Sequence, residues 1–176
     1  GSLVTFVDVD GDGALEMLEP TAEISLTSMV RALFARSFRV DVSIRPPSRE
    51  HGFFAPSAVQ EVSARYDIDL GASTALRGAP PFFGHDFDGD GVHDAILPEG
   101  GERMVLHRGV ERGDRPLRAD GFVTLDGPAS GTAFVLPPGP PGAPPDVVVF
   151  YVGRDDLRTQ LRVHVNRHRR AAVGTP

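Results

Sequence analysis

Cysteine is absent from the 176-residue sequence, which excludes a disulfide framework, a thiolate zinc site and a cysteine nucleophile. Lysine is absent as well, since all 18 basic residues are Arg, and this excludes the phosphate-binding loop Gly-x-x-x-x-Gly-Lys. No apolar run approaches the roughly 20 residues that a membrane-spanning helix needs. We therefore predict no membrane span.

Glycine and proline are abundant, with 20 Gly and 16 Pro, and this argues against an all-helical fold because both residues break helix interiors. With 40% hydrophobic residues the chain can bury one core, so we predict a single domain over residues 1–176. The net charge of −6 argues against nucleic acid as a partner.

Short apolar segments separated by Gly, Pro and Asp turns predict an all-β fold. Residues 38–44 and 62–70 alternate between apolar and polar side chains, as half-buried strands do. One helix is predicted at residues 22–36, after Pro20-Thr21, because its apolar residues have helical spacing. The other predicted strands are residues 3–9, 94–97, 104–107, 122–125, 133–136, 147–152 and 161–165.

Two segments, residues 8–16 and 86–94, place carboxylates at positions 1, 3, 5 and 9 and glycines at positions 4 and 6. Several carboxylates within nine residues repel one another unless a cation lies among them. Calcium takes six to eight oxygen ligands, including side chains at positions 1, 3 and 5 and a backbone carbonyl at position 7. The predicted ligands of two Ca²⁺ ions are Asp8, Asp10, Asp12, the Ala14 carbonyl and Glu16, and then Asp86, Asp88, Asp90, the Val92 carbonyl and Asp94.

Three alternatives stay open for these loops. Asp-Gly-Asp-Gly is also good turn chemistry without any ion. Magnesium is a second possibility, although a loop this rich in oxygens favours calcium. The first loop also fits the EF-hand formula, with Glu19 at position 12, whereas Leu97 stands at position 12 of the second loop.

The pattern Asp-x-Asp-Gly-Asp-Gly-x-x-Asp followed by a short apolar strand resembles the FG-GAP or VCBS repeat of integrin-alpha-like β-propellers and bacterial surface proteins. The resemblance implies four-stranded blades around an axis, with calcium in the loops. We predict repeat 1 at about residues 3–80, repeat 2 at 81–130, a degenerate repeat 3 at 131–168, and a tail at 169–176.

The third repeat has Asp146 in the place of Asp94, but Pro138, Pro140 and Gly142 replace its ligands, so no ion is predicted there. Three repeats are too few to close a ring, whose usual minimum is four blades. Either residues 38–80 form an additional blade, or the chain is the C-terminal part of a larger propeller whose further blades the parent protein can supply. We favour the second alternative.

No nucleophile elbow Gly-x-Ser-x-Gly and no His-Glu-x-x-His motif occurs, so we predict no enzymatic activity. The histidines of the second loop, His85 and His93, are interpreted as solvated or packed, because calcium prefers oxygen. The tripeptide 112–114, Arg-Gly-Asp, is interpreted as turn residues rather than an adhesion ligand.

These observations together predict a calcium-stabilised scaffold or binding module of an exported or cell-surface bacterial protein, extracellular or periplasmic, with an unknown protein or glycan partner. A carbohydrate-binding or carbohydrate-active module is an alternative, which the absence of Trp and the presence of only two Tyr weaken. An EF-hand-like protein is a second alternative. Gly1-Ser2 has the character of a cloning remnant, so we expect the natural upstream part, with any export signal, to be missing.

Overall fold

The structure is a computed structural model of the chain. It describes residues 4–22, 25–70, 75–111, 115–126, 131–135, 143–151 and 161–166. The tripeptide 112–114, the tail 169–176 and the proline-rich ligand positions at Pro138, Pro140 and Gly142 lie outside the described residues.

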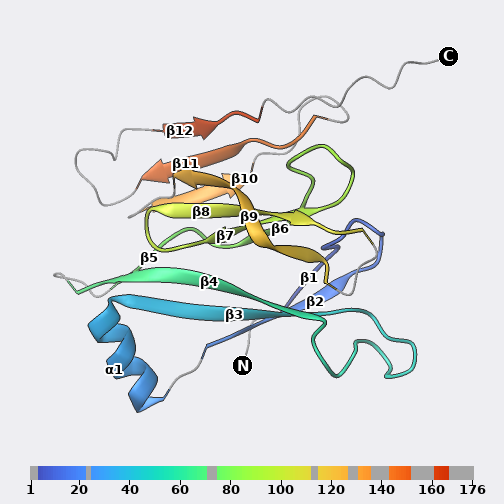
Figure 1. Cartoon of the computed structure of the whole chain (residues 1–176), viewed down its shortest axis with the longest axis horizontal. Helices are drawn as coiled ribbons and strands as arrows, with labels where there is room; N and C mark the ends of the chain where they lie inside the picture. The colour runs from blue at the N-terminus through green and yellow to red at the C-terminus, as the bar shows by residue number, and fades with distance from the viewer. Residues whose placement is uncertain are drawn as a thin grey trace.

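The described strands form three antiparallel sheets, and each sheet is a meander of strands that follow one another in the chain (Figure 1). The first sheet contains β1 (Thr5–Val7), β2 (Glu16–Thr21), β3 (Ser37–Arg45), β4 (Gln60–Asp69) and β5 (Ala75–Arg77). The second contains β6 (Phe82–His85), β7 (Asp94–Pro98), β8 (Arg103–Gly109) and β9 (Leu117–Asp126). The third contains β10 (Gly131–Val135), β11 (Val147–Tyr151) and β12 (Leu161–His164).

The prediction of an all-β fold is confirmed, and no sheet closes on itself within the described part of the chain. The alternating segments form β3 and β4, whose register places Val42 opposite Val62. The sequence patterns missed β2, which lacks a clear alternation, and also β5 and β6, which have only three and four residues and are too short to show a period.

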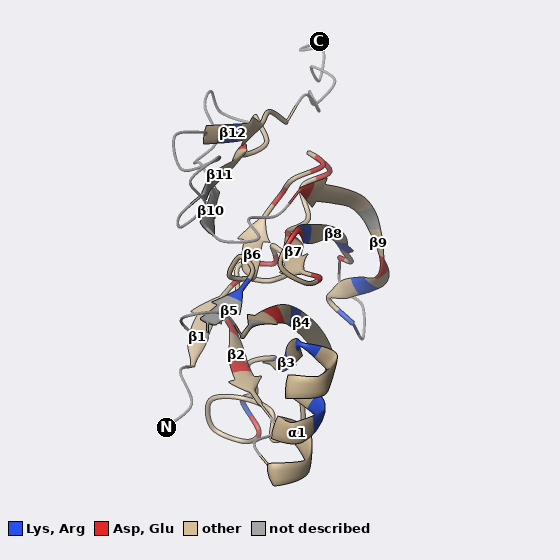
Figure 2. Cartoon of the chain, turned by 90° about the vertical axis from the view of Figure 1, so that its left-hand side faces the viewer, with Lys and Arg blue, Asp and Glu red and all other residues tan. Residues whose placement is uncertain are grey.

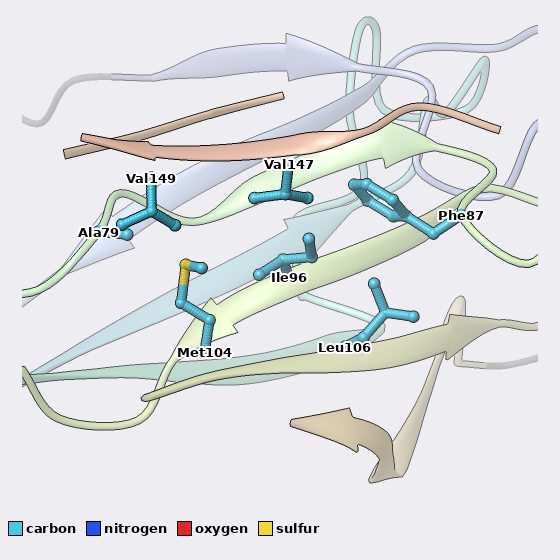
Figure 3. Close-up of a cluster of buried hydrophobic side chains, with 7 residues drawn as sticks. All are labelled: Ala79, Phe87, Ile96, Met104, Leu106, Val147 and Val149. Atoms are coloured by element: carbon cyan, nitrogen blue, oxygen red, sulfur yellow. The ribbon is translucent and has the colours of Figure 1, made fainter. Parts of the chain in front are cut away.

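The three sheets lie as successive layers, with the second sheet in the middle (Figure 1). All five residues of β7 are buried, because its alternate side chains point to opposite faces of this middle sheet. Ala95 belongs to the core shared with the first sheet, and Ile96 to the core shared with the third. In Figure 3, Val147 and Val149 of the third sheet face Ile96 and Met104 of the second. Burial of each large aliphatic side chain stabilises the layers by about 1.5–3 kcal/mol.

The predicted helix at residues 22–36 is present but shorter, as α1 (Leu26–Ala35). Its N-cap is Ser25, whose side chain accepts a hydrogen bond from the Ser28 N–H at 3.0 Å. The expected start at Pro20-Thr21 is wrong, because both residues belong to β2 and pair with β3. The helix connects these two strands and ends at Arg36, whose φ of 49° is left-handed.

No residue of α1 is buried, although its apolar side chains share one face. Leu26 and Phe34 are 80% and 87% exposed. The helix therefore adds little to the core. No helix in the described part of the chain is long and apolar enough to cross a bilayer.

Candidate metal sites

The two acidic loops occupy the same place in their sheets. Residues 8–16 connect β1 to β2, where Val7 pairs with Glu16, and residues 86–94 connect β6 to β7, where His85 pairs with Asp94. Strands thus flank both loops, whereas an EF-hand loop joins two helices. Glu19, the candidate EF-hand ligand, lies in β2, and its Oε2 accepts a hydrogen bond from Arg45 Nε at 3.2 Å.

The carboxylate at position 1 holds each loop in its turn. In the first loop, Asp8 accepts hydrogen bonds from the N–H groups of Gly11 at 2.7 Å and Gly13 at 3.0 Å. The second loop has the same pair of bonds, from Gly89 at 2.6 Å and Gly91 at 2.9 Å to Asp86. The two backbones are therefore folded by the same interactions.

The glycine at position 6 adopts a left-handed conformation in both loops, with φ of 89° at Gly13 and 95° at Gly91. A side chain would be strained at this φ, which is why the turn needs glycine. The turn brings carboxylates that are apart in sequence around one point.

Each loop gathers three carboxylates that could hold a metal ion. One oxygen from each of Asp8, Asp10 and Glu16 lies within 4.8 Å of the others. The corresponding group in the second loop consists of Asp86, Asp88 and Asp90, within the same distance.

Two predicted ligands lie outside these groups, one in each loop. Asp12 accepts a hydrogen bond from the Ala14 N–H at 2.7 Å, and Asp94 points into the core. The corresponding N–H of Val92 donates to Asp90 at 2.8 Å, so position 7 is held by the same contact in both loops. The carbonyls of Ala14 and Val92 stay predicted ligands.

Asp94 is completely buried and connects three backbone segments. Its carboxylate accepts hydrogen bonds from the N–H groups of Phe87 at 2.8 Å, Asp88 at 3.2 Å and Gly109 at 2.9 Å. Burial, with a smaller contribution from the charge of nearby Asp88, raises the pKa of Asp94 to about 6 against the opposing effect of these N–H donors. The residue thus closes the loop from inside the core.

The corresponding residue of the first loop, Glu16, both bonds to the backbone and belongs to the carboxylate group. It is 5% exposed and accepts a hydrogen bond from the Val9 N–H at 2.7 Å, as Asp94 does from Phe87. It also belongs to the carboxylate group of its loop. Burial raises the pKa of Glu16, and nearby Asp10 adds to the shift.

The first loop therefore carries an electrostatic cost without a cation. Burial raises the pKa of Asp10, and the charges of Asp12 and Asp8 raise it further, while a hydrogen bond from the Asp12 N–H opposes both. A divalent ion at this position would favour the ionised carboxylates.

The two loops touch each other through His93. Its imidazole Nδ1 lies 2.8 Å from the Asp8 carbonyl oxygen and 4.0 Å from the Asp8 carboxylate. A side chain on Gly11 would lie 3.4 Å from the Gly91 oxygen and 3.5 Å from the His93 nitrogen. The half-buried His93 therefore joins the two loops across the first and second sheets, a contact that its position in the sequence does not reveal.

Two residues of β8 support the second loop and were missed by the sequence patterns. Arg108 Nε forms an ion pair with Asp88 Oδ2 at 2.9 Å. A side chain on Gly109 would lie 2.0 Å from the His93 carbonyl oxygen, so only glycine allows the bond to Asp94. Both contacts arise from the pairing of β7 with β8, which loop motifs do not describe.

The predicted equivalence of Asp146 and Asp94 has a structural counterpart. Asp146 Oδ1 accepts a hydrogen bond from the Asn166 N–H at 2.7 Å, after β12, as Asp94 does from Gly109 at the end of β8. The third sheet thus has, like the second, a carboxylate that accepts a hydrogen bond from a backbone N–H at or after the end of a later strand.

Comparisons of the chain with family models, with curated proteins and with solved structures find no match. The function is therefore inferred from the geometry of the two loops.

Proposed function

We propose that the chain is a calcium-binding, calcium-stabilised β-repeat module of propeller type, which acts as a scaffold or binding unit of an exported or cell-surface protein. One observation carries the proposal. The same loop occurs in both the first and the second sheet. In each, two backbone N–H groups donate hydrogen bonds to the carboxylate at position 1, and three carboxylates lie close together.

The donor set favours calcium over softer metals. The two groups contain only carboxylate oxygens, and neither contains a histidine nitrogen or a sulfur atom. Hard oxygens suit Ca²⁺ and Mg²⁺, and a flexible loop that offers many oxygens suits Ca²⁺ better. Bound ions would reduce the repulsion among carboxylates that are partly withdrawn from water.

The propeller assignment is supported by three consecutive antiparallel meanders that pack face to face. Propeller blades are four-stranded antiparallel sheets, as the second sheet is, and a ring needs at least four of them. We propose that further blades come from the parent protein.

Stabilisation by calcium follows from linkage. An ion that binds only the folded state at a hundredfold excess over its Kd stabilises it by about 2.7 kcal/mol. For a chain of this size such a change corresponds to roughly 5–10 °C in Tm.

The test is a calorimetric calcium titration of chelator-stripped protein, with a melting curve at each end. Two matched variants at position 3, Asp10→Asn and Asp88→Asn, remove one charge from each loop. Each keeps an oxygen that can accept the hydrogen bond from the N–H at position 5. Asp120→Asn, at an exposed position of β9 outside both loops, is the control.

We expect two binding events, a higher Tm in calcium, and the loss of one event in each loop variant but not in the control. No heat and no shift in Tm would mean that both loops are ordinary turns. An equal response to magnesium would contradict the choice of calcium.

The proposed location has its own measurable consequence. Extracellular modules use sites with Kd of about 10⁻⁴–10⁻³ M. A Kd in that range supports export, and a submicromolar Kd counts against it.

A further inference from the structure

A groove of about 1060 Å³ lies between the first and second sheets, away from the two acidic loops. One wall is formed by β4 and the preceding residues 56–59, and the other by β8 and β9. Hydrophobic contacts hold the two sheets together around Val42 and Ala95.

The groove exists because one edge of β4 is only partly covered. Its neighbour β5 pairs with residues Asp67, Ile68 and Asp69 alone. Residues 60–66 of β4 therefore have β3 on one side and no strand of the same sheet on the other.

The direction of the β4 backbone groups follows from two hydrogen bonds. Ile68 donates its N–H to the Arg36 carbonyl at 2.9 Å, on the β3 side, whereas the Arg65 carbonyl accepts from the Gly100 N–H at 2.8 Å, on the open side. Backbone groups alternate along an antiparallel strand. Glu61 and Ser63 therefore direct their N–H and C=O groups into the groove.

Both ends of this open edge already have partners from the second sheet. At one end, Arg65 forms an isolated parallel bridge with Glu99. At the other end, the Gln60 side chain bonds to the Leu117 nitrogen at 2.9 Å and oxygen at 2.8 Å. Between them, no backbone partner of Glu61 or Ser63 occurs on this side in the described part of the chain. The gap spans about 17 Å at the rise of a strand.

The groove is strongly basic. Six arginines and His107 line it, against two glutamates, Glu61 and Glu99. The basic segments of β4, β8 and β9 are drawn in blue in Figure 2. The six arginines are Arg39, Arg45, Arg65, Arg103, Arg115 and Arg118.

Half of these arginines have carboxylate partners and half do not. Arg39, Arg45 and Arg103 form ion pairs with Asp41, Glu19 and Glu99 respectively. The other three, Arg65, Arg115 and Arg118, are exposed and form no ion pair with the described residues. A protein with net charge −6 thus has, beside an open strand edge, three arginines that no described carboxylate neutralises.

We propose that this groove binds an acidic peptide segment in extended conformation, which adds as a strand beside residues 61–63 of β4. The peptide backbone would bond to the open edge and its acidic side chains would meet the unpaired arginines. Among the described residues that line the groove there is no Phe, Tyr or Trp on which a base or a sugar ring could stack, which favours a peptide over nucleic acid or glycan. No groove residue belongs to the acidic loops, so the proposal does not rest on calcium.

The experiment measures fluorescence anisotropy with a labelled peptide of alternating Glu and Thr, ten residues long. The matched probes are a Lys-Thr peptide of the same length and a Glu-Thr peptide that is N-methylated at every amide, so that neither of its strand edges keeps an N–H donor. We expect binding of the Glu-Thr peptide alone, weakening as salt is raised. Equal binding of the N-methylated peptide would overturn strand addition, because that probe keeps the charges and lacks the backbone N–H donors of both edges.

Charge-reversed variants locate the site on the protein. Arg65→Glu and Arg118→Glu reverse unpaired charges on opposite walls, and Arg31→Glu on the exposed helix α1 makes the same change outside the groove. We expect each groove variant to weaken binding about tenfold or more and the control to change it less than about twofold. Equal effects of all three variants would mean that binding follows net charge, and would overturn the proposal.

A backbone variant tests the open edge directly. Ser63→Pro removes the N–H that points into the groove, and Ser63→Ala removes only the side-chain bond to Asp41. We expect about a tenfold loss with proline and little change with alanine. If the proline variant does not fold, as judged by its Tm, the N-methylated peptide makes the same test from the side of the ligand. Binding of a sulfated polysaccharide in place of the Glu-Thr peptide would overturn the choice of partner.

Discussion

The two acidic loops have the same backbone conformation and hydrogen bonds, and they differ in which carboxylates lie close together. In the first loop, position 9 is Glu16, which bonds to Val9 and still reaches the group formed with Asp8 and Asp10. In the second loop, position 9 is Asp94, whose side chain is one methylene shorter. Its carboxylate is buried and bonds to the N–H groups of Phe87 and Gly109. A repeated loop can thus keep its turn and change its ligand set through the length of one side chain.

The loops also differ in the cations nearby. Arg108 pairs with Asp88 at position 3 of the second loop. The corresponding Asp10 of the first loop forms no ion pair with the described residues. A bound ion in the second loop would share Asp88 with an arginine, so we expect the second site to be the weaker one.

The largest expected effect concerns the buried Asp94. Because its pKa is raised to about 6 in the folded state, the folded protein binds this proton more tightly than the unfolded chain does. The group stabilises the fold below about pH 4, and this stability is lost as the pH rises through about 6.

The stability of the wild type relative to Asp94→Asn should therefore rise by about 2–2.5 kcal/mol as the pH falls from about 7 to 4. Urea unfolding of both proteins in chelator measures this difference. A difference that does not change with pH would show that Asp94 titrates normally.

An intermediate effect is expected from Glu16→Asp, which removes the extra methylene of the first loop. The shorter side chain cannot both accept from Val9 and join Asp8 and Asp10, so calcium affinity at this loop should fall about tenfold, with the second loop unchanged. Calorimetric titration measures both sites. Glu19→Asp on β2 is the control, and an equal loss in the two variants would contradict the role of Glu16.

The smallest effect is expected from Arg108→Ala. Removal of the arginine frees Asp88 and should tighten calcium binding at the second loop about three- to fivefold, the size typical of a half-exposed ion pair. Arg103→Ala, on the same strand but paired with Glu99, is the control. Weaker binding in Arg108→Ala would mean that the arginine positions Asp88 for the ion.

Local patterns predicted much of the fold, because strands and turns follow from neighbouring residues. The alternation of Val40, Val42 and Ile44 matches one face of β3, where Val42 and Ile44 are buried. The start of the helix was misplaced because Pro20 resembles a helix start, whereas pairing with β3 holds it in a strand. Tertiary pairing therefore outweighed a local signal.

The candidate metal site was predicted in part for a similar reason. The spacing of Asp and Gly identified both loops, and ten ligands were predicted from it. The separate roles of Asp12 and Asp94 were not predictable, since they depend on side-chain direction and on burial beside Gly109.

The sequence by itself determined an all-β chain with two like acidic loops, because alternation, turn glycines and carboxylate spacing act within a few residues. Only the tertiary structure decided that His93 joins the loops, that Arg108 meets Asp88, and that arginines of β3, β4, β8 and β9 line one groove. These contacts arise where separate sheets or paired strands meet, and their geometry depends on how the layers pack around Ala95 and Ile96.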